Sequence, residues 1–245
     1  MNIYKKIKGL TTLIVTLVMS SSVNAQETVS GDASLTSRQQ SLITISAYTA
    51  KGDLVKLKAG LNTALDGGLT INEAKEAIIH LYAYCGFPRS IRGLQTLMAV
   101  LTERKAKGIN DKMGAESTPL KDDRSKYERG KEILGKLTGA PQDGPATGYA
   151  AFAPEIEIFL KEHLFADIFE RDILSYTDRE LVTVAVLSSI GGAEPMLRSH
   201  LTICLNVGLK PGQLHQFVGV IRSAIGKKEA EAAQKVLDEI LINKK

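Results

Sequence analysis

The sequence has no tryptophan, only two cysteines among 245 residues, and 5% aromatic residues in all. So few cysteines exclude a disulfide-rich scaffold. Residues 34–107 show no alternation of apolar and polar side chains with the period of a β-strand. Beyond the N-terminal segment no apolar run approaches the ~20 residues of a membrane-spanning helix. With alanine, leucine, lysine and glutamate common, these absences favour an all-α protein.

The charge of the chain is nearly balanced. Its formal net charge is +4, but Lys5, Lys6 and Lys8 supply three of these charges and residues 1–25 contain no acidic residue. The remainder therefore carries +1. A chain so close to neutral gives no reason to expect nucleic acid or an acidic membrane surface as a partner.

Residues 1–25 have the pattern of a secretory signal peptide. A lysine-rich start precedes an apolar stretch from Leu10 to Met19, and Val23-Asn24-Ala25 fits a cleavage site. The pattern predicts a mature chain that begins near Gln26, is exported to the periplasm, and has no membrane contact after cleavage. An uncleaved membrane anchor is the alternative.

The stretch from Thr177 to Gly208 predicts two helices joined by a tight turn. Thr177-x-x-Glu180 reads as a capping box ahead of an apolar run. Gly191-Gly192 ends that helix, and Pro195 suits the first turn of the next. In this second helix the side chains that share an inward face with His200 are apolar: Met196, Ile203 and Val207.

Further helices follow from caps, glycine breaks and apolar periodicity. Thr36-x-x-Gln39 and Thr70-x-x-Glu73 are capping boxes, and Gly86-Phe87-Pro88 is a break. The other helices are expected at 36–50, 54–66, 70–85, 89–105, 127–137, 154–171, 211–225 and 228–242. Residues 108–148 are polar and rich in Gly, Asp, Lys and Pro, which indicates a linker around one short helix.

The two halves of the chain repeat each other. When Leu65-Asp66-Gly67-Gly68-Leu69 is aligned with 205–209, an offset of 140, the order of helices and glycine breaks matches throughout. An internal repeat of a helical unit therefore underlies the architecture.

Several of these segments resemble the carboxymuconolactone decarboxylase family. They are TDRELV and its His200 helix, YERGKEILGKLTG from Tyr127, and HLFADIFERD from His163. The resemblance covers about 34–107 and 125–240. It implies an all-α, alkylhydroperoxidase D-like fold in two tandem units, residues 34–107 and 125–245, with a polar linker at 108–124. It also implies a homo-oligomer, here a trimer of two-unit chains that mimics a hexamer.

The two copies have complementary losses. His200 aligns with Gly60, and Glu180 aligns with Gln39 if one gap is allowed. Conversely the family-like residues of the first copy, Glu73, Glu76, Tyr84, Phe87 and Pro88, align with Gln213, Gln216, Ala224, Lys227 and Lys228. The pattern suggests one site built from both copies, and drift after duplication is the alternative.

The expected catalytic residues are Glu180 and His200. Histidine titrates near neutrality and can move a proton at a substrate carbon or oxygen, while the carboxylate orients it. The resemblance then implies cofactor-free lyase or isomerase chemistry on a small carboxylated or lactone substrate. Arginine binds carboxylates bidentately, so the candidate substrate-binding residues are Arg179, Arg198 and Arg222, with Tyr84 from the first copy.

Structural alternatives exist for each of these residues. Glu180 at the third position of a capping box needs no catalytic role, and an inward histidine can be an ordinary core residue. The competing function is a non-catalytic helical binding or assembly module. Thiol peroxidases of this fold use Cys-x-x-Cys before the histidine, where this chain has Ala193 and Met196, so that chemistry is disfavoured.

The cysteines and histidines predict no metal site. Cys85 and Cys204 each fall within a helical apolar pattern, which favours two buried free thiols over the disulfide that export would permit. The four histidines, His80, His163, His200 and His215, show no ligand spacing with the cysteines or with one another.

Overall fold

The computed structural model describes residues 34–243, and all regular structure in that range is helical. The expected all-α fold is therefore confirmed. The helices, in chain order, are α1 (Ser37–Lys51), α2 (Leu54–Asp66), α3 (Ile71–His80), α4 (Tyr82–Ala106), α5 (Lys126–Thr138), α6 (Gly148–Phe152), α7 (Pro154–Phe159), the π-helix η1 (Leu160–Ile168), α8 (Tyr176–Ile190), α9 (Glu194–Asn206), α10 (Pro211–Ile225) and α11 (Lys227–Asn243).

The predicted signal peptide, residues 1–25, lies outside the described residues. Among the helices of residues 34–243, none combines the length and the apolar character needed to cross a bilayer.

Local sequence sets most helix boundaries as expected. Thr36 and Thr70 form capping boxes with Gln39 and Glu73 at the starts of α1 and α3. Gly52 ends α1 with φ of 69°, a left-handed conformation that costs glycine nothing. The predicted second helix matches α2 at both ends.

The predicted start of α8 is wrong. Ser175, and not Thr177, caps the helix: its hydroxyl accepts from the backbone N–H of Asp178 and lies 2.9 Å from that residue's carboxylate. The Thr177 hydroxyl instead donates to the carbonyl of Val207, at 3.2 Å. Glu180 therefore has no capping role, and its position needs another explanation.

Gly86 divides α4 into two parts. Its φ of 81° and ψ of 160° are not helical, so a new helix starts at Phe87, whereas Leu81 between α3 and α4 keeps right-handed helical dihedrals. Gly226 separates α10 from α11 with a similar backbone, φ 119° and ψ 178°. The two glycines are 140 residues apart, which is the offset of the sequence repeat.

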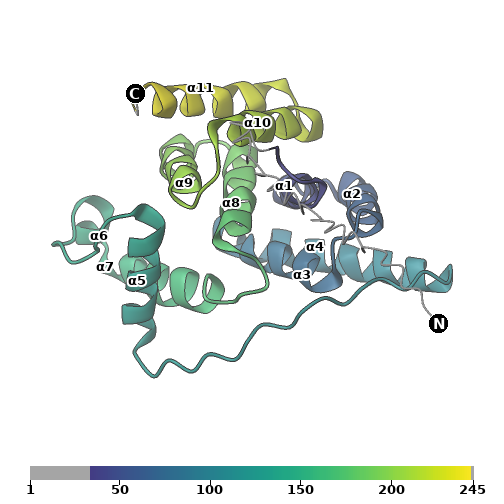
Figure 1. Ribbon diagram of the computed structural model, residues 1–245, viewed down its shortest axis with the longest axis horizontal. Coiled ribbons are helices and arrows are strands. Elements are labelled where there is room, and N and C mark those ends of the chain that lie inside the picture. The colour runs from purple at the N-terminus through teal and green to yellow at the C-terminus, as the bar shows by residue number, and fades with distance from the viewer. Residues whose placement is uncertain (1–33, 244–245) are drawn as a thin grey trace, which may run out of the picture. The chain divides into compact units, whose positions relative to one another are not determined.

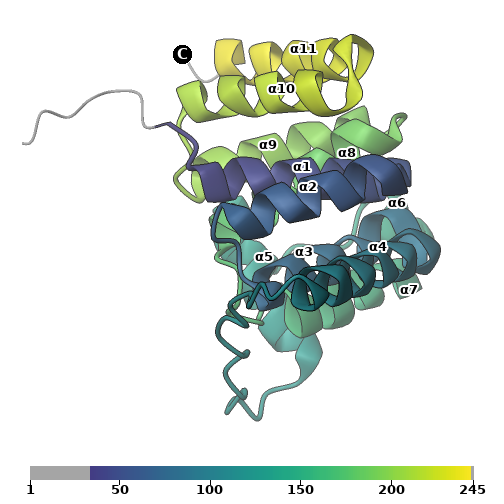
Figure 2. The same cartoon turned by 90° about the vertical axis from the view of Figure 1, so that its right-hand side faces the viewer.

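The repeated helices form three layers. Helices α1, α2, α8 and α9 lie between the α10–α11 pair and the α3–α4 pair (Figure 2). Helix α2 packs on α4 as α9 packs on α11, and α1 packs along α8 at the centre. Helices α3 and α10 each contact the first helix of the other copy, α8 and α1 respectively. The two copies thus exchange equivalent contacts across the α1–α8 pair.

The hydrophobic cores also mix the two copies. One core joins Ile43 and Ala47 of α1 to helices α8 to α11, and the other joins α1 to α4 with Val182 and Val186 of α8. The described residues, 34–243, consequently belong to one compact unit, although the sequence repeats within it.

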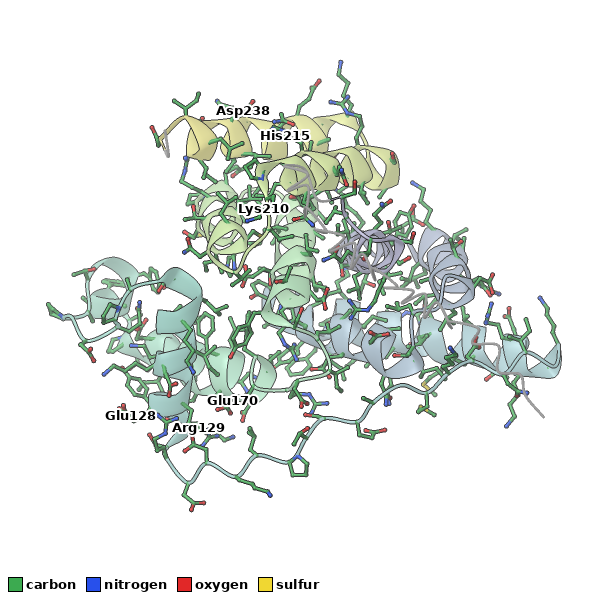
Figure 3. The ribbon with its side chains drawn as sticks, viewed as in Figure 1. Glu128, Arg129, Glu170, Lys210, His215 and Asp238 are labelled. Carbon is green, nitrogen blue, oxygen red and sulfur yellow. The ribbon has the colours of Figure 1, made fainter. Side chains whose placement is uncertain are left out.

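Helix α5 and η1 form a hairpin that stands against α9 (Figure 1). Gly130 is required at their crossing, because a Cβ there would lie 1.8 Å from the carbonyl oxygen of Lys161. Arg129 and Glu170 close one end of the hairpin with an ion pair of 2.8 Å (Figure 3). Phe165 and Phe169 of the hairpin share a cluster with Ile203 of α9.

The expected helix at 154–171 is present in a modified form. Helix α7 passes directly into η1, nine residues with π-helical hydrogen bonding. Such π segments are rare and are often found near functional sites. Here the segment carries Phe165, which packs in one cluster with Ile203 of α9, and Phe169 follows at its end.

At the opposite side, α10 and α11 pack as a second hairpin, in which His215 and Asp238 lie close together (Figure 3). The Gln234 amide contacts His215 at 3.2 Å and Asp238 at 2.7 Å.

Candidate functional site

Glu180 and His200 are hydrogen-bonded to each other. Nδ1 of His200 lies 2.8 Å from Oε2 of Glu180, and the glutamate is fully buried while 14% of the histidine side chain is exposed. The other carboxylate oxygen, Oε1, is buried and has no hydrogen-bond partner among the described residues. The contact expected from the tight turn between the two helices is thus present, and it gives Glu180 a reason to lie inside.

Tyr84 completes this group from the first copy. Its ring meets the His200 ring edge to face, with 5.9 Å between centroids. Tyr84 and His200 are both partly exposed. Residues of both copies therefore meet at one place within a single chain. Phe87, the other expected contributor, is 62% exposed and stacks on Tyr82 instead.

A line of polar side chains runs beside this group between α3 and α8. Arg179 donates to Oε1 of Glu76 at 2.7 Å and lies 3.3 Å from Nδ1 of His80. Nε2 of His80 lies 2.8 Å from the Thr183 hydroxyl, which lies 3.3 Å from the Tyr84 hydroxyl. Residues 76, 80 and 84 are spaced by four on one helix face, and Arg179 and Thr183 match them on α8.

Burial controls the protonation of this line. Burial first, and then the charges of Arg179 and His200, hold the pKa of His80 well below its usual value, so its ring stays neutral. Burial and the charge of Glu180 raise the pKa of the Tyr84 phenol, which therefore keeps its proton. Phe169 covers His80 at 5.2 Å between ring centroids and excludes water there.

The three candidate arginines lie in different environments. Arg179 is fully buried and is paired with Glu76, which Arg171 also contacts at 3.0 Å. Arg198 pairs with Glu239 at the surface of α9 and α11. Arg222 is exposed on α10. Within residues 34–243, no hydrogen bond or ion pair joins these arginines to His200 or Glu180, so their role in holding a carboxylate stays a prediction.

Five pockets in the described part of the chain lie elsewhere. Neither Glu180, His200 nor Tyr84 lines any of them. Only 14% of the His200 side chain is open to solvent.

The equivalent position between α1 and α10 lacks the polar side chains that lie between α3 and α8. The helix caps Thr36 and Ser175 align α1 with α8 at an offset of 139, so Ser41, and not Gln39, stands opposite Glu180. In place of the polar line between α3 and α8, α10 and α1 border an open surface pocket of about 650 Å³. Its lining is Gln40, Thr44, Tyr48, Gln216, Gly219, Val220, Ser223 and Ala224.

Sequence reasoning missed His80 and Thr183. The available signal was the spacing of Glu76, His80 and Tyr84, which places a carboxylate, an imidazole and a phenol on one helix face. Nothing in the sequence marks Thr183 as functional, because a threonine within an apolar helix is usually interpreted as a packing residue.

The cysteines and the remaining histidines lie outside the group. Cys85 and Cys204 are free thiols, the first half-buried and the second fully buried. His163 is half-exposed and bonds Asp167 at 3.1 Å. Within residues 34–243, no three His, Cys, Asp or Glu side chains are placed to hold a metal ion.

The chain belongs to the carboxymuconolactone decarboxylase family, whose model matches it twice, over residues 22–97 and 154–239. The two matches confirm the tandem arrangement. Among characterised proteins, the chain is similar to the 4-carboxymuconolactone decarboxylase of Acinetobacter baylyi. The two are 25% identical over 120 residues, which is 49% of this chain and 89% of that protein.

Proposed function

We propose that Glu180 and His200 are the acid–base pair of a cofactor-free lyase or isomerase that acts on a small carboxylated or lactone substrate. The observation that carries the proposal is the fully buried carboxylate of Glu180, held 2.8 Å from Nδ1 of His200 without any capping role. A buried carboxylate needs a strong reason to stay inside. Orienting a catalytic imidazole supplies one.

The geometry suits proton transfer through the outer nitrogen of His200. When ionised Glu180 accepts a hydrogen bond from the N–H at Nδ1, Nε2 carries the lone pair and can act as a general base. Once Nε2 is protonated, the carboxylate stabilises the imidazolium, which then acts as a general acid.

Decarboxylation would use the acid form. The bond between the substrate carbon and its carboxylate breaks, carbon dioxide leaves, and the electron pair moves onto the neighbouring carbonyl to form an enolate. The imidazolium of His200 protonates the carbon, and solvent returns a proton to the ring. An isomerase would use both forms, taking a proton from one carbon and returning it to another.

The test uses 4-carboxymuconolactone, the substrate named for the relative, and a panel of carboxylated lactones and β-keto acids. We expect turnover by the full chain and a loss of about 10²–10⁴ in kcat for His200→Ala. The matched control is Ser199→Ala, since Ser199 neighbours His200 on the exposed side of α9. Equal activity of the two variants would contradict the proposed role of His200.

The second candidate is a non-catalytic helical binding or assembly module. It is favoured by the position of the five pockets away from His200 and by the pairing of Arg179 and Arg198 with glutamates. A wild-type chain that neither turns over nor binds any member of the panel, by calorimetry, would support this function instead.

We also propose that the chain acts after export. The support is the signal pattern of residues 1–25. N-terminal sequencing of protein from the periplasm should give a start near Gln26, whereas a cytoplasmic chain that begins at Met1 would contradict export.

A further inference from the structure

We propose that Arg179, His80 and Thr183 form a hydrogen-bond relay of fixed direction, which leaves the hydroxyl proton of Tyr84 free to stabilise an oxyanion formed beside His200. The inference rests on the proposed function, because it assigns Tyr84 a role in that reaction. The relay itself is a property of the folded chain and can be tested without turnover.

The direction of the relay follows from the arginine. A guanidinium has only donors, so at the 3.3 Å contact Nδ1 of His80 must accept from Arg179. A neutral imidazole has one N–H, which is then on Nε2. This N–H donates to the Thr183 oxygen at 2.8 Å, which leaves the Thr183 hydroxyl its own proton to donate to Tyr84 at 3.3 Å.

The last proton of the relay has no acceptor within the described residues. Tyr84 receives a hydrogen bond from Thr183, and no hydrogen bond from its own hydroxyl to another described residue is present. The Tyr84 ring touches the ring of His200. The Tyr84 hydroxyl proton is therefore uncommitted among the described residues, and the inference requires a substrate oxygen to reach it while His200 serves the adjacent carbon.

The first residue of the relay is fixed in place. Glu76 holds Arg179 at 2.7 Å and is itself held by Arg171 at 3.0 Å. Phe169 lies over the Arg179 guanidinium at 5.8 Å. Neither partner can turn away without leaving a buried charge unpaired, which is strongly unfavourable.

Packing alone does not require the relay. The other copy forms the same contact between α10 and α1. There the places of Glu76, His80 and Tyr84 are taken by Gln216, Val220 and Ala224, which line a pocket with Gln40 and Thr44. The same helix pair therefore assembles without the polar line, so that line serves something other than assembly.

In the proposed decarboxylation, Tyr84 would act where charge develops. The electron pair of the broken carbon–carboxylate bond moves to the carbonyl oxygen, and the Tyr84 hydroxyl donates a hydrogen bond to it. Tyr84 keeps its proton throughout, since the carbon takes its proton from His200. Removing one such donor from an oxyanion site typically lowers kcat by about 10²–10³.

The relay is tested first by nuclear magnetic resonance of the folded wild-type chain. Long-range ¹H–¹⁵N spectra distinguish protonated from unprotonated ring nitrogens. We expect His80 to be neutral, protonated at Nε2 and unprotonated at Nδ1, from pH 6 to pH 8. Protonation at Nδ1, or at both nitrogens, would overturn the relay whatever the activity of the chain.

The catalytic consequence is tested with 4-carboxymuconolactone. Tyr84→Phe should lower kcat by about 10², and Thr183→Val should lower kcat with little change in KM, with recovery in Thr183→Ser. The double variant Tyr84→Phe/Thr183→Val should lose as much kcat as Tyr84→Phe alone, because Thr183 acts only through Tyr84. The matched control is Thr44→Val, the equivalent position in the first copy, which should leave kcat unchanged.

The outcomes separate this inference from the proposed function. If the wild-type chain shows no turnover, the proposed function and the hydrogen bond from Tyr84 to the substrate are both overturned. The protonation state of His80 in the spectrum still tests the relay. A chain that loses activity in His200→Ala but keeps full activity in Thr183→Val and Tyr84→Phe overturns the inference and leaves the proposed function standing.

Discussion

Tyr84 and His200 belong to different copies of the repeat, yet their rings meet edge to face within one chain, with centroids 5.9 Å apart. Of the residues that differ between the copies, Tyr84 of the first and Glu180 and His200 of the second meet here, whereas Glu73 caps α3 and Phe87 stacks on Tyr82.

This contact should couple the stabilities of the two copies. In a double-mutant cycle of Tyr84→Ala and His200→Ala, we expect a coupling free energy of about 0.5–1.5 kcal/mol, as for other aromatic pairs. Urea unfolding followed by circular dichroism measures it. Tyr84→Phe keeps the ring and is the control, and a coupling of zero would show that the rings do not meet in solution.

The buried pair of Glu76 and Arg179 should contribute strongly to stability. Glu76→Ala leaves the guanidinium of Arg179 without this fully buried partner, so we expect a loss of about 3–5 kcal/mol in the free energy of unfolding. Replacing both residues with leucine should recover much of that loss. The control is Lys58→Ala, which breaks an exposed pair with Glu103 and should cost less than about 1 kcal/mol.

The neutral state of His80 predicts a loss of stability in mild acid. Its pKa is lowered in the folded chain by burial, so the unfolded chain binds the proton more readily. This contribution is complete above the unfolded pKa of about 6.5 and falls by up to ~1.4 kcal/mol per pH unit below it. Thermal unfolding between pH 7.5 and 5 should be less pH-dependent in His80→Gln, and equal slopes would contradict a neutral His80.

Neither thiol should react readily in the folded protein. Burial raises the pKa of Cys85 to about 11 and that of Cys204 well above its usual value, so little thiolate exists at pH 7. A chromogenic disulfide reagent should label both cysteines only after denaturation. Rapid labelling of Cys204 in the native chain would contradict its burial.

The predicted trimer has a candidate contact surface on α6 and α7. Large apolar side chains are exposed there, including Phe152 at 92% and Phe159 at 62%. Such a cluster is typical of an interface. Light scattering should give three times the mass of one chain, and Phe152→Ser/Phe159→Ser should give a single-chain mass. Val55→Ser, at an exposed position on α2, is the control, and a monomeric wild type would exclude the trimer.

Helix positions were predictable because the signals are local. The caps at Thr36 and Thr70 and the breaks at Gly52 and Gly86 act through neighbouring backbone groups. The start of α8 was not predictable in this way. Ser175-x-x-Asp178 and Thr177-x-x-Glu180 are both plausible caps, and the burial of Glu180 against His200 accompanies the first of them.

The site was predictable only in part, for a related reason. Glu180 and His200 lie on adjacent helices, so a tight turn suffices to predict their approach. The contact of His80 with Thr183 joins residues 103 positions apart and depends on which helices pack together. The sequence does not show which acidic residue an arginine pairs with. For that reason Arg179, Arg198 and Arg222 were equally good candidates for binding a substrate carboxylate.

The pocket between α1 and α10 has a consequence for stoichiometry. Because its lining contains neither a carboxylate nor an imidazole, the two repeats do not form two equivalent binding places. A ligand of the His200 site should therefore titrate with one molecule per chain and not one per repeat. If the proposed site at His200 is the place where ligand binds, cooperativity in an assembled protein would then have to arise between chains.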